Sequence, residues 1–524
     1  MRAESAVTGA LNHMYRFLHP QAAIIYDPTS EDGFFVKGMR SKTGKMGLSL
    51  IEVPKDRIEE LMWITRLDAG SLKQWHDPAV DVLIQVPSDS SSVLRLLKSI
   101  KDADYSGLRP PRITLELPAE LDVSLKQHLA KFEWPPHSDH GGANGGLIVR
   151  RRISSHHHNQ EESAIRFLEL FYPSSTSNSH VLLLSPQAQL SSHYFHFIKY
   201  ALLEYKYSTF GAFDNAGLMG ISLDLPSVLL DGKTQLPLPS TEDMHTDRYK
   251  KLLPKVKSAP FMWQAPNSHA TLFFGDKWAE LHSFLGGRVA KQRTATKPSS
   301  RKKLVSETLP AWTEYMLELM RVRGYSLLYP AKYSPALVTI HNELYYAPEE
   351  FIASLTADGK ELPAAPSESN EAFLRAEGLV KPPKHVEASI MPGSVPLHLA
   401  LPFSGDLPEI PHLPQLLYDG QQIDLVNVST IAKAYADSFR EEIGGCTIPK
   451  GKHKKMTAGE AGDLFCYGDE DASDWEDDET REVELFHAPI DDQLEKLIDE
   501  ALPSAATSTR QKTITRPTAV AEDI

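Results

Sequence analysis

Polar side chains follow two predicted strands of this chain. Ser185 and Gln187 come directly after the apolar run 180–184, which has the composition of a strand buried on both faces. Pro87 and Asp89 follow an earlier apolar run of the same kind. Because the carboxyl ends of parallel strands meet at one edge of a sheet, we expect these residues to line a nucleotide site.

Two carboxylates near this edge have a second interpretation. Asp89 stands where a residue caps the following helix, and the cap is the favoured interpretation. Glu116 lies within the predicted strand 112–117, where a salt-bridged surface carboxylate fits as well as a ligand contact.

A second concentration of polar and aromatic residues lies in residues 261–282. Aromatic rings pack on the C–H groups of a sugar and carboxylates accept its hydroxyl protons, so the composition suits sugar binding. A buried tryptophan core beside a capped helix fits equally well. The residues concerned are Trp263, Gln264, Asn267, His269, Asp276, Glu280 and His282.

The elements that must position these residues alternate between strand and helix. The period of about 30 residues is typical of βαβ units and predicts right-handed crossovers and a mostly parallel sheet. The central unit is the strand 180–184 and a helix with Phe195, Ile198 and Leu202 on one face. The other predicted strands are 22–26, 48–53, 80–86, 112–117, 146–152, 218–225, 261–265 and 325–329. The other predicted helices are 34–40, 57–67, 93–100, 123–132, 161–171, 276–288, 312–323 and 431–442.

Composition excludes some classes of function. The chain has 524 residues, of which 41% are hydrophobic, and a net charge of -14. This sign argues against nucleic-acid binding, which needs a basic face. The expected parts are a partial α/β module (1–78), a main α/β domain (79–345), a proline-rich extension packing on the core (346–445) and a disordered acidic tail (446–524).

Several familiar motifs are absent. The sequence has no G-x-S-x-G, H-E-x-x-H, P-loop or G-x-G-x-x-G, so hydrolase, zinc-protease, kinase-like and dinucleotide-binding interpretations lose their usual anchor. The adjacent histidines 156–158 share no face and predict a solvated loop, and no residue is assigned as a metal ligand. Two free thiols are favoured over a disulfide for Cys446 and Cys466. No apolar run reaches the roughly 18 residues of a membrane span.

Several stretches of the chain resemble a known family. VDVLIQVP, SHVLLLSPQAQLS, ALLEYKYS and MWQAPNSHATLFFGDKWAELHSFL are similar to a group of fungal proteins classed as glycosyltransferase-2-like, over about residues 10–445. The resemblance implies a nucleotide-sugar transferase fold of the GT-A type, with a nucleotide-sugar donor and a glycan or protein acceptor. It also implies a membrane anchor in a longer N-terminal region and a location in the Golgi or secretory lumen, whereas the chain as written is expected to be soluble.

The resemblance also implies roles for the residues above. Donor contacts would come from Pro87, Asp89, Glu116, Ser185, Gln187 and Asp224, and sugar or acceptor contacts from Trp263, Gln264 and His282. Asp276 and Glu280 are the candidates for the catalytic base.

The motif after the central strand departs from the family. Such transferases usually hold Mn²⁺ or Mg²⁺ on an Asp-x-Asp at this point, where this chain has Ser185-Pro186-Gln187. Asp224 or Asp276 could supply the carboxylate, the reaction could be independent of metal, or there could be no reaction. A non-catalytic scaffold that binds a glycan or a partner protein is therefore an alternative function, and an unrelated α/β nucleotide-binding enzyme is a third.

Overall fold

The computed structural model describes residues 2–477 apart from 88–91, 120, 122, 137–145, 153–159, 295–302, 333–335, 342–389, 391–392, 394, 456–458, 469 and 471. One compact unit spans Met1–Asp477. The predicted cap Asp89, the three histidines 156–158 and residues 478–524 of the expected tail lie outside the described residues.

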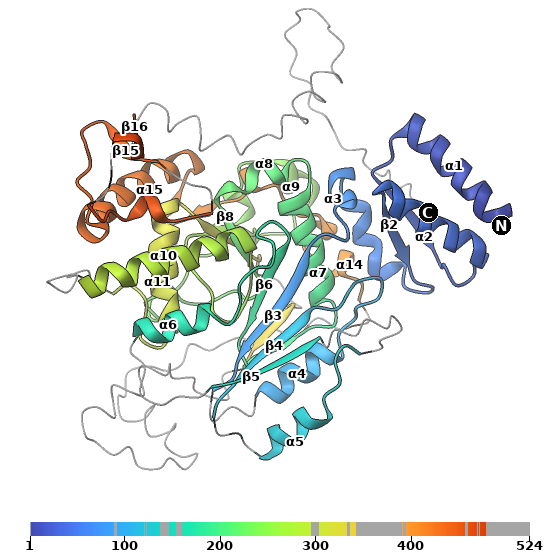
Figure 1. The fold of residues 1–524 in the computed structure, drawn as a ribbon, viewed down its shortest axis with the longest axis horizontal. Helices are drawn as coiled ribbons and strands as arrows, with labels where there is room; N and C mark the ends of the chain where they lie inside the picture. Colours follow the sequence, from blue (N-terminus) through green and yellow to red (C-terminus); the bar gives the residue numbers. More distant parts are fainter. Residues whose placement is uncertain are drawn as a thin grey trace, which may run out of the picture. The chain divides into compact units, whose positions relative to one another are not determined.

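The N-terminal module is a βαβ unit preceded by a helix. Strands β1 (Ala22–Tyr26) and β2 (Ser49–Val53) pair in parallel, and helices α1 (Arg2–Leu18) and α2 (Gly33–Met46) lie beside them (Figure 1). The Asp32 carboxylate caps α2 by accepting the backbone N–H groups of Phe34 and Phe35. The predicted helix 57–67 is a 3-10 helix, η1 (Glu59–Arg66).

A ten-stranded mixed sheet forms the centre of the molecule. Its order is β14-β13-β9-β11-β8-β10-β6-β3-β4-β5. Five of the nine pairings are parallel and four are antiparallel, so the sheet is mixed where the sequence predicts a mostly parallel one. Two of the antiparallel pairings come from β10 (Ala270–Phe273), an unpredicted strand that runs antiparallel to both of its neighbours, and the other two join β9 to β11 and β13 to β14. Gly220 lets β10 approach closely, because a Cβ there would lie 2.1 Å from the Leu272 carbonyl oxygen.

The bounds of the remaining elements follow. The sheet contains β3 (Ala79–Gln85), β4 (Arg112–Leu117), β5 (Leu147–Arg151), β6 (Ser179–Leu184), β8 (Leu218–Ser222), β9 (Phe261–Trp263), β11 (Ser326–Tyr329), β13 (Gln415–Leu416) and β14 (Gln422–Ile423), and separate pairs are formed by β7 (Ala188–Leu190) with β12 (Val338–Ile340) and β15 (Lys452–Lys454) with β16 (Trp475–Asp477). The α-helices are α3 (Ala69–Lys73), α4 (Val93–Lys101), α5 (Val123–Lys131), α6 (Gln160–Leu168), α7 (Tyr194–Leu202), α8 (Gly211–Asp214), α9 (Arg248–Leu252), α10 (Gly275–Thr294), α11 (Trp312–Arg323), α14 (Leu397–Ala400) and α15 (Leu425–Phe439). Two π-helices, η2 (Leu203–Tyr207) and η7 (Arg440–Gly444), extend α7 and α15, and short 3-10 turns are η3 (Asn215–Gly217), η4 (Thr241–Asp243), η5 (Phe403–Gly405), η6 (Ile410–His412), η8 (Gly462–Leu464) and η9 (Ala472–Asp474).

Both faces of the sheet are covered. In β6 the side chains alternate, so that Leu182 and Leu184 join one apolar cluster while Val181 and Leu183 join the other. The first cluster includes side chains of η1, α4 and α7, and the second those of α6, α10, α11 and α15. Figure 1 shows α6, α10 and α11 together on one side of the strands and α4 and α7 on the other. The burial of β6 on both faces, predicted from its composition, is confirmed.

Residues after Gly445 are more ordered than the sequence predicts. Cys446 and Cys466 form a disulfide, so the expectation of two free thiols is wrong. Among the described residues from 446 to 477, β15 and β16 form an antiparallel pair. Buried ion pairs of Asp463 with Arg323 and Arg440 connect this segment to the rest of the protein. Amino-acid composition alone does not reveal such ion pairs.

No described helix combines the length and hydrophobicity that crossing a bilayer requires.

Candidate functional site

The strand order reverses between β3 and β6. From β3 the chain proceeds to β4 and β5 on one side and then returns to place β6 on the other side. Ile84 of β3 pairs with Leu184 of β6, so the residues after them, Pro87 and Ser185, emerge at the same edge of the sheet. Open α/β sheets bind ligands at such a switch point, outside the carboxyl ends of the strands. The structure therefore brings together Pro87 and Ser185, at which the two loops picked out in the sequence begin.

The loop after β6 is a short turn held by backbone contacts. The Ser185 N–H donates to the His269 carbonyl oxygen at 2.6 Å, and the Ser185 carbonyl accepts from the Ala188 N–H at 3.0 Å. The Gln187 carbonyl accepts from the His341 N–H at 3.0 Å, beside the pairing of β7 with β12. The turn contains no carboxylate, so it offers backbone and neutral side-chain groups to a ligand.

Glu116 is a buried carboxylate with charged partners. Its side chain is 4% exposed and accepts a hydrogen bond from Gln85 Nε2 at 2.7 Å. Arg152 lies 3.3 Å and Arg166 3.6 Å from its two oxygens. The ion-paired interpretation of Glu116 is therefore the one that the geometry favours, although the pair is buried rather than on the surface. Glu116 also holds two guanidinium groups near the carboxyl ends of β4 and β5.

A carboxylate–imidazole pair lies at the same edge, between β8 and β10. Asp224 follows β8 and His269 precedes β10, with Asp224 Oδ2 3.0 Å from His269 Nδ1. Asn267 supports both residues, since its Nδ2 lies 3.4 Å from Asp224 Oδ2 and its Oδ1 accepts the His269 backbone N–H at 2.8 Å. A proton on Nδ1 donated to Asp224 leaves Nε2 as an acceptor, and the His269 side chain is 36% exposed. The pair can therefore accept a proton from a bound molecule.

His269 was not among the site residues predicted from the sequence, although it lies in the polar segment 261–282. The missing information was the strand β10 itself, which pairs with β6 and puts His269 against Ser185. The signal in the sequence is weak, because β10 has only four residues and follows directly on the polar stretch.

The predicted base candidates lie elsewhere. Asp276 is in the first turn of α10, at the amino end of β6, where it pairs with Lys206 at 2.8 Å. Glu280 is buried and accepts hydrogen bonds from Arg323 Nε at 2.7 Å and the Tyr325 hydroxyl at 2.8 Å. The structure thus separates both residues from the strand-end loops with which the sequence groups them. Glu280 is also poorly suited to act as a base, because each of its carboxylate oxygens already accepts a hydrogen bond.

Of the predicted sugar contacts, Trp263 and Gln264 are buried in the interior and His282 is half-buried. Trp263 is 1% exposed and its ring lies 5.1 Å from that of Tyr329. Gln264 Nε2 donates to the Met320 carbonyl at 3.3 Å, and His282 Nε2 lies 3.0 Å from the Phe171 carbonyl. Trp263 is also four strands away from β6, about 19 Å at the usual spacing. Trp263 and Gln264 therefore belong to the buried core that was the alternative interpretation, whereas His269 of the same segment lies at the sheet edge.

One group of metal-capable side chains occurs among the described residues. Glu60, Asp104 and His193 offer ligand atoms that all lie within 4.8 Å of one another. Burial would raise the pKa of Asp104, but the nearby His196 imidazole and the hydrogen bonds from Ser106 outweigh it and keep that pKa lowered. Burial lowers the pKa of His193. These residues were not predicted as ligands, since they come from three distant parts of the sequence.

The N-terminal module carries a hollow of about 740 Å³. Its lining consists of Pro28, Thr29, Gly33, Val36, Lys37, Arg40 and Ser41. The start of α2 borders it, but Asp32 already accepts the free N–H groups that would otherwise attract an anion.

The fold and this edge define an α/β protein with a mixed sheet and a polar switch point. A family model described as the SPBC1E8.03c N-terminal domain matches residues 1–75, which cover the N-terminal module and precede β3. A search of curated proteins finds no match to the chain.

Proposed function

We propose that this chain is a glycosyltransferase of the GT-A type, which moves a sugar from a nucleotide-sugar donor to the hydroxyl group of a glycan or protein. The observation that carries the proposal is the position of the Asp224–His269 pair at the same sheet edge as the β3/β6 switch point. The resemblance of the segments around these strands to glycosyltransferase-2-like proteins supports the same class. The strand-order reversal between β3 and β6 fits an unrelated α/β nucleotide-binding enzyme equally well, so the resemblance of the sequence segments is what favours the transferase.

The donor binds at the carboxyl ends of β3 and β6. Pro87, after β3, contacts the nucleotide, and the turn at Ser185 and Gln187 faces the diphosphate with backbone and neutral groups. Arg152 and Arg166 add positive charge nearby, partly offset by Glu116.

His269 is the base that the geometry favours for a direct displacement. Its Nε2 takes the proton of the acceptor hydroxyl while the acceptor oxygen bonds to the anomeric carbon. The bond from that carbon to the diphosphate oxygen breaks, and the nucleoside diphosphate leaves with the electron pair. Asp224 stabilises the imidazolium that forms. His269 and Asp224 thus replace Asp276 and Glu280 in the proposed mechanism.

The residues at this edge do not fit a Mn²⁺ or Mg²⁺ ion on the donor diphosphate. The turn at Ser185 has no carboxylate, Glu116 is paired with two arginines, and Asp224 is engaged by His269 and Asn267. Hard divalent ions need several free oxygen ligands. No step of the mechanism is therefore routed through such an ion.

Donor hydrolysis tests the proposal without knowledge of the acceptor. The full chain is first screened by calorimetry against UDP- and GDP-sugars, and nucleoside diphosphate release is then measured for the donor that binds. His269→Ala should lower the rate by about 10²- to 10⁴-fold with donor affinity unchanged. The exposed His245 provides the matched control, and His245→Ala should leave the rate unchanged. A folded sample that binds no nucleotide sugar, or an H269A variant with the full rate, would refute the proposal.

A transferase-like scaffold without catalysis is the second candidate. The neutral turn Ser185-Pro186-Gln187 favours it, because the usual charge compensation for the leaving diphosphate is absent. Binding of a nucleotide sugar without any turnover, in the wild type as in H269A, would select this candidate.

A further inference from the structure

Three side chains from separate elements converge on one buried point on the α7 side of the sheet. Glu60 belongs to η1, Asp104 follows α4, and His193 immediately precedes α7. Glu60 Oε2 lies 3.4 Å from His193 Nδ1, and the side chains of Glu60, Asp104 and His193 are 15%, 15% and 2% exposed. The point is thus enclosed by protein and is separate from the Asp224–His269 pair.

The polar atoms at this point are not satisfied by the protein. Glu60 Oε2, Asp104 Oδ2 and His193 Nδ1 are buried and make no hydrogen bond of good geometry. Neither carboxylate has a lysine or arginine partner among the described residues. Buried polar groups are nearly always hydrogen-bonded, and buried charges are paired or coordinate metals. A bound cation would satisfy both carboxylates and the imidazole at once.

His196 orients this group but does not belong to the ligand set. Trp63 Nε1 donates a hydrogen bond to His196 Nδ1 at 3.3 Å, so Nδ1 is the acceptor and Nε2 carries the proton of the neutral ring. That Nε2 faces Asp104 Oδ2 at 3.5 Å. The other oxygen, Oδ1, accepts from the backbone N–H and the hydroxyl of Ser106 at 2.9 and 2.6 Å. Metal ligands are commonly held by such outer partners.

We propose that Glu60, Asp104 and His193 bind a divalent transition metal ion, with Zn²⁺ as the best fit, which ties η1 and the end of α4 to the start of α7. One imidazole and two carboxylates suit this class of ion better than Ca²⁺ or Mg²⁺, which prefer oxygen ligands only. Bonds of about 2.1 Å to a tetrahedral ion set the ligand atoms about 3.4 Å apart, which is the spacing of Glu60 Oε2 and His193 Nδ1. The enclosure of the point favours a structural role.

Metal content of the full chain tests the inference. The protein is treated with a chelator, dialysed against Zn²⁺, freed of excess metal and analysed by elemental mass spectrometry. The wild type should retain about one ion per chain, and Glu60→Gln and His193→Gln should each reduce retention at least about tenfold. The exposed neighbour Glu59 gives the matched control, and Glu59→Gln should retain the ion. Zn²⁺ should raise the melting temperature of the wild type and of E59Q but not of E60Q.

A measurement on the wild type alone tests the inference even if the variants fail to fold. Co²⁺ added to the chelated protein should give the visible absorption of a tetrahedral site, without the charge-transfer band of a thiolate ligand. Wild-type protein that retains no Zn²⁺ and shows no Co²⁺ spectrum would overturn the inference, as would a folded E60Q that retains as much metal as E59Q. Neither result depends on donor binding, so the metal-site proposal and the transferase proposal are tested independently.

Discussion

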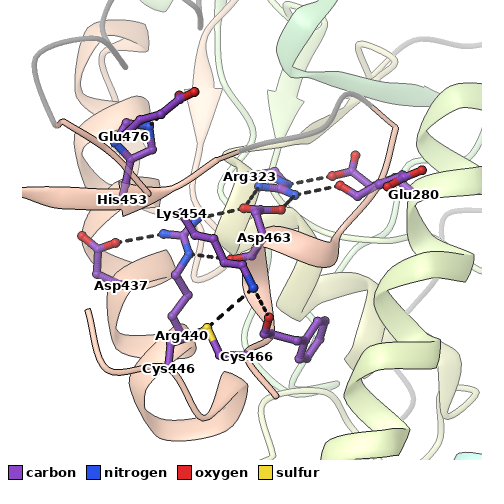
Figure 2. A network of polar contacts seen from close by, with 12 residues as sticks. Glu280, Arg323, Asp437, Arg440, Cys446, His453, Lys454, Asp463, Cys466 and Glu476 are labelled. Carbon is purple, nitrogen blue, oxygen red and sulfur yellow. Dashed lines mark hydrogen bonds and ion pairs between the residues drawn. A yellow bond between two sulfur atoms is a disulfide. The ribbon is translucent and has the colours of Figure 1, made fainter. Parts of the chain in front are cut away.

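Replacing Asp463 by asparagine should strongly destabilise the protein. The Asp463 side chain is fully buried and accepts three charged hydrogen bonds. Arg323 donates from Nη2 to Oδ1 at 2.6 Å and from Nη1 to Oδ2 at 2.9 Å, and Arg440 donates to Oδ2 at 2.8 Å. Figure 2 shows Asp463 between these two arginines, with Glu280 on the far side of Arg323. Burial alone would raise the pKa of Asp463, but the two guanidinium groups outweigh it and lower that pKa.

The cost follows from the charges that the substitution leaves behind. The asparagine amide removes one negative charge and turns an N–H donor toward a guanidinium. Breaking a buried ion pair by removing one partner costs about 3–5 kcal/mol. Asp437 provides the matched control, because it pairs with the same Arg440 at 2.9 Å but its side chain is 42% exposed. Asp437→Asn should therefore cost only about 0–1 kcal/mol.

Urea denaturation followed by tryptophan fluorescence measures both variants. We expect the free energy of unfolding of D463N to lie at least about 2 kcal/mol below that of D437N, the difference between the two ranges above. If the two variants are equally stable, the segment around Asp463 does not pack against α11 and α15 as described. The expectation of a disordered tail that begins at residue 446 would then be right for this segment.

Two further predictions concern acid and redox conditions. Burial, with a further contribution from the Lys206 charge, lowers the pKa of His180 to about 3. Between about pH 6.5 and pH 3 the unfolded chain therefore binds one proton more at this residue than the folded chain does. Over this range the free energy of unfolding should fall by about 1.4 kcal/mol for each pH unit of acidification. His180→Asn should flatten this part of the profile of unfolding free energy against pH, and an unchanged slope would argue against a buried neutral imidazole. Reduction of the Cys446–Cys466 disulfide, which spans 20 residues, should lower the free energy of unfolding by about 3 kcal/mol. Equal denaturation midpoints with and without reductant would contradict that expectation.

The elements that the sequence predicts well are those with a strong local signal. The predicted helix 312–323 has the same bounds as α11, and Gly324 ends it with φ 71°, a conformation that glycine adopts at low cost. Strand β4 likewise has its predicted bounds. Both elements are long enough for their hydrophobic pattern to be read without knowledge of their neighbours.

The ordered segment after Gly445 could not be predicted in this way. Its stability depends on Asp463 meeting Arg323 and Arg440, which are 140 and 23 residues away in sequence. Such contacts leave no trace in local composition, and the polar residues that make them look like those of a disordered tail.

The candidate site was only half predictable, and the reason is the short strand β10. The parallel run of β3 and β6 follows from their apolar composition, and it correctly brings Pro87 and Ser185 to one edge. The other site candidates follow Phe261 in the sequence, where β10 reverses the direction of the chain: Ala270 pairs with Leu184 and Phe273 with Val181.

Strand β10 thus carries the chain about 10 Å from the carboxyl end of β6 back to its amino end. His269, just before this strand, therefore lies beside Ser185, while Asp276, just after it, lies beside His180 at the opposite edge. The direction of one four-residue strand thus decides which of these two residues lies at the edge proposed for the donor, and that residue is His269.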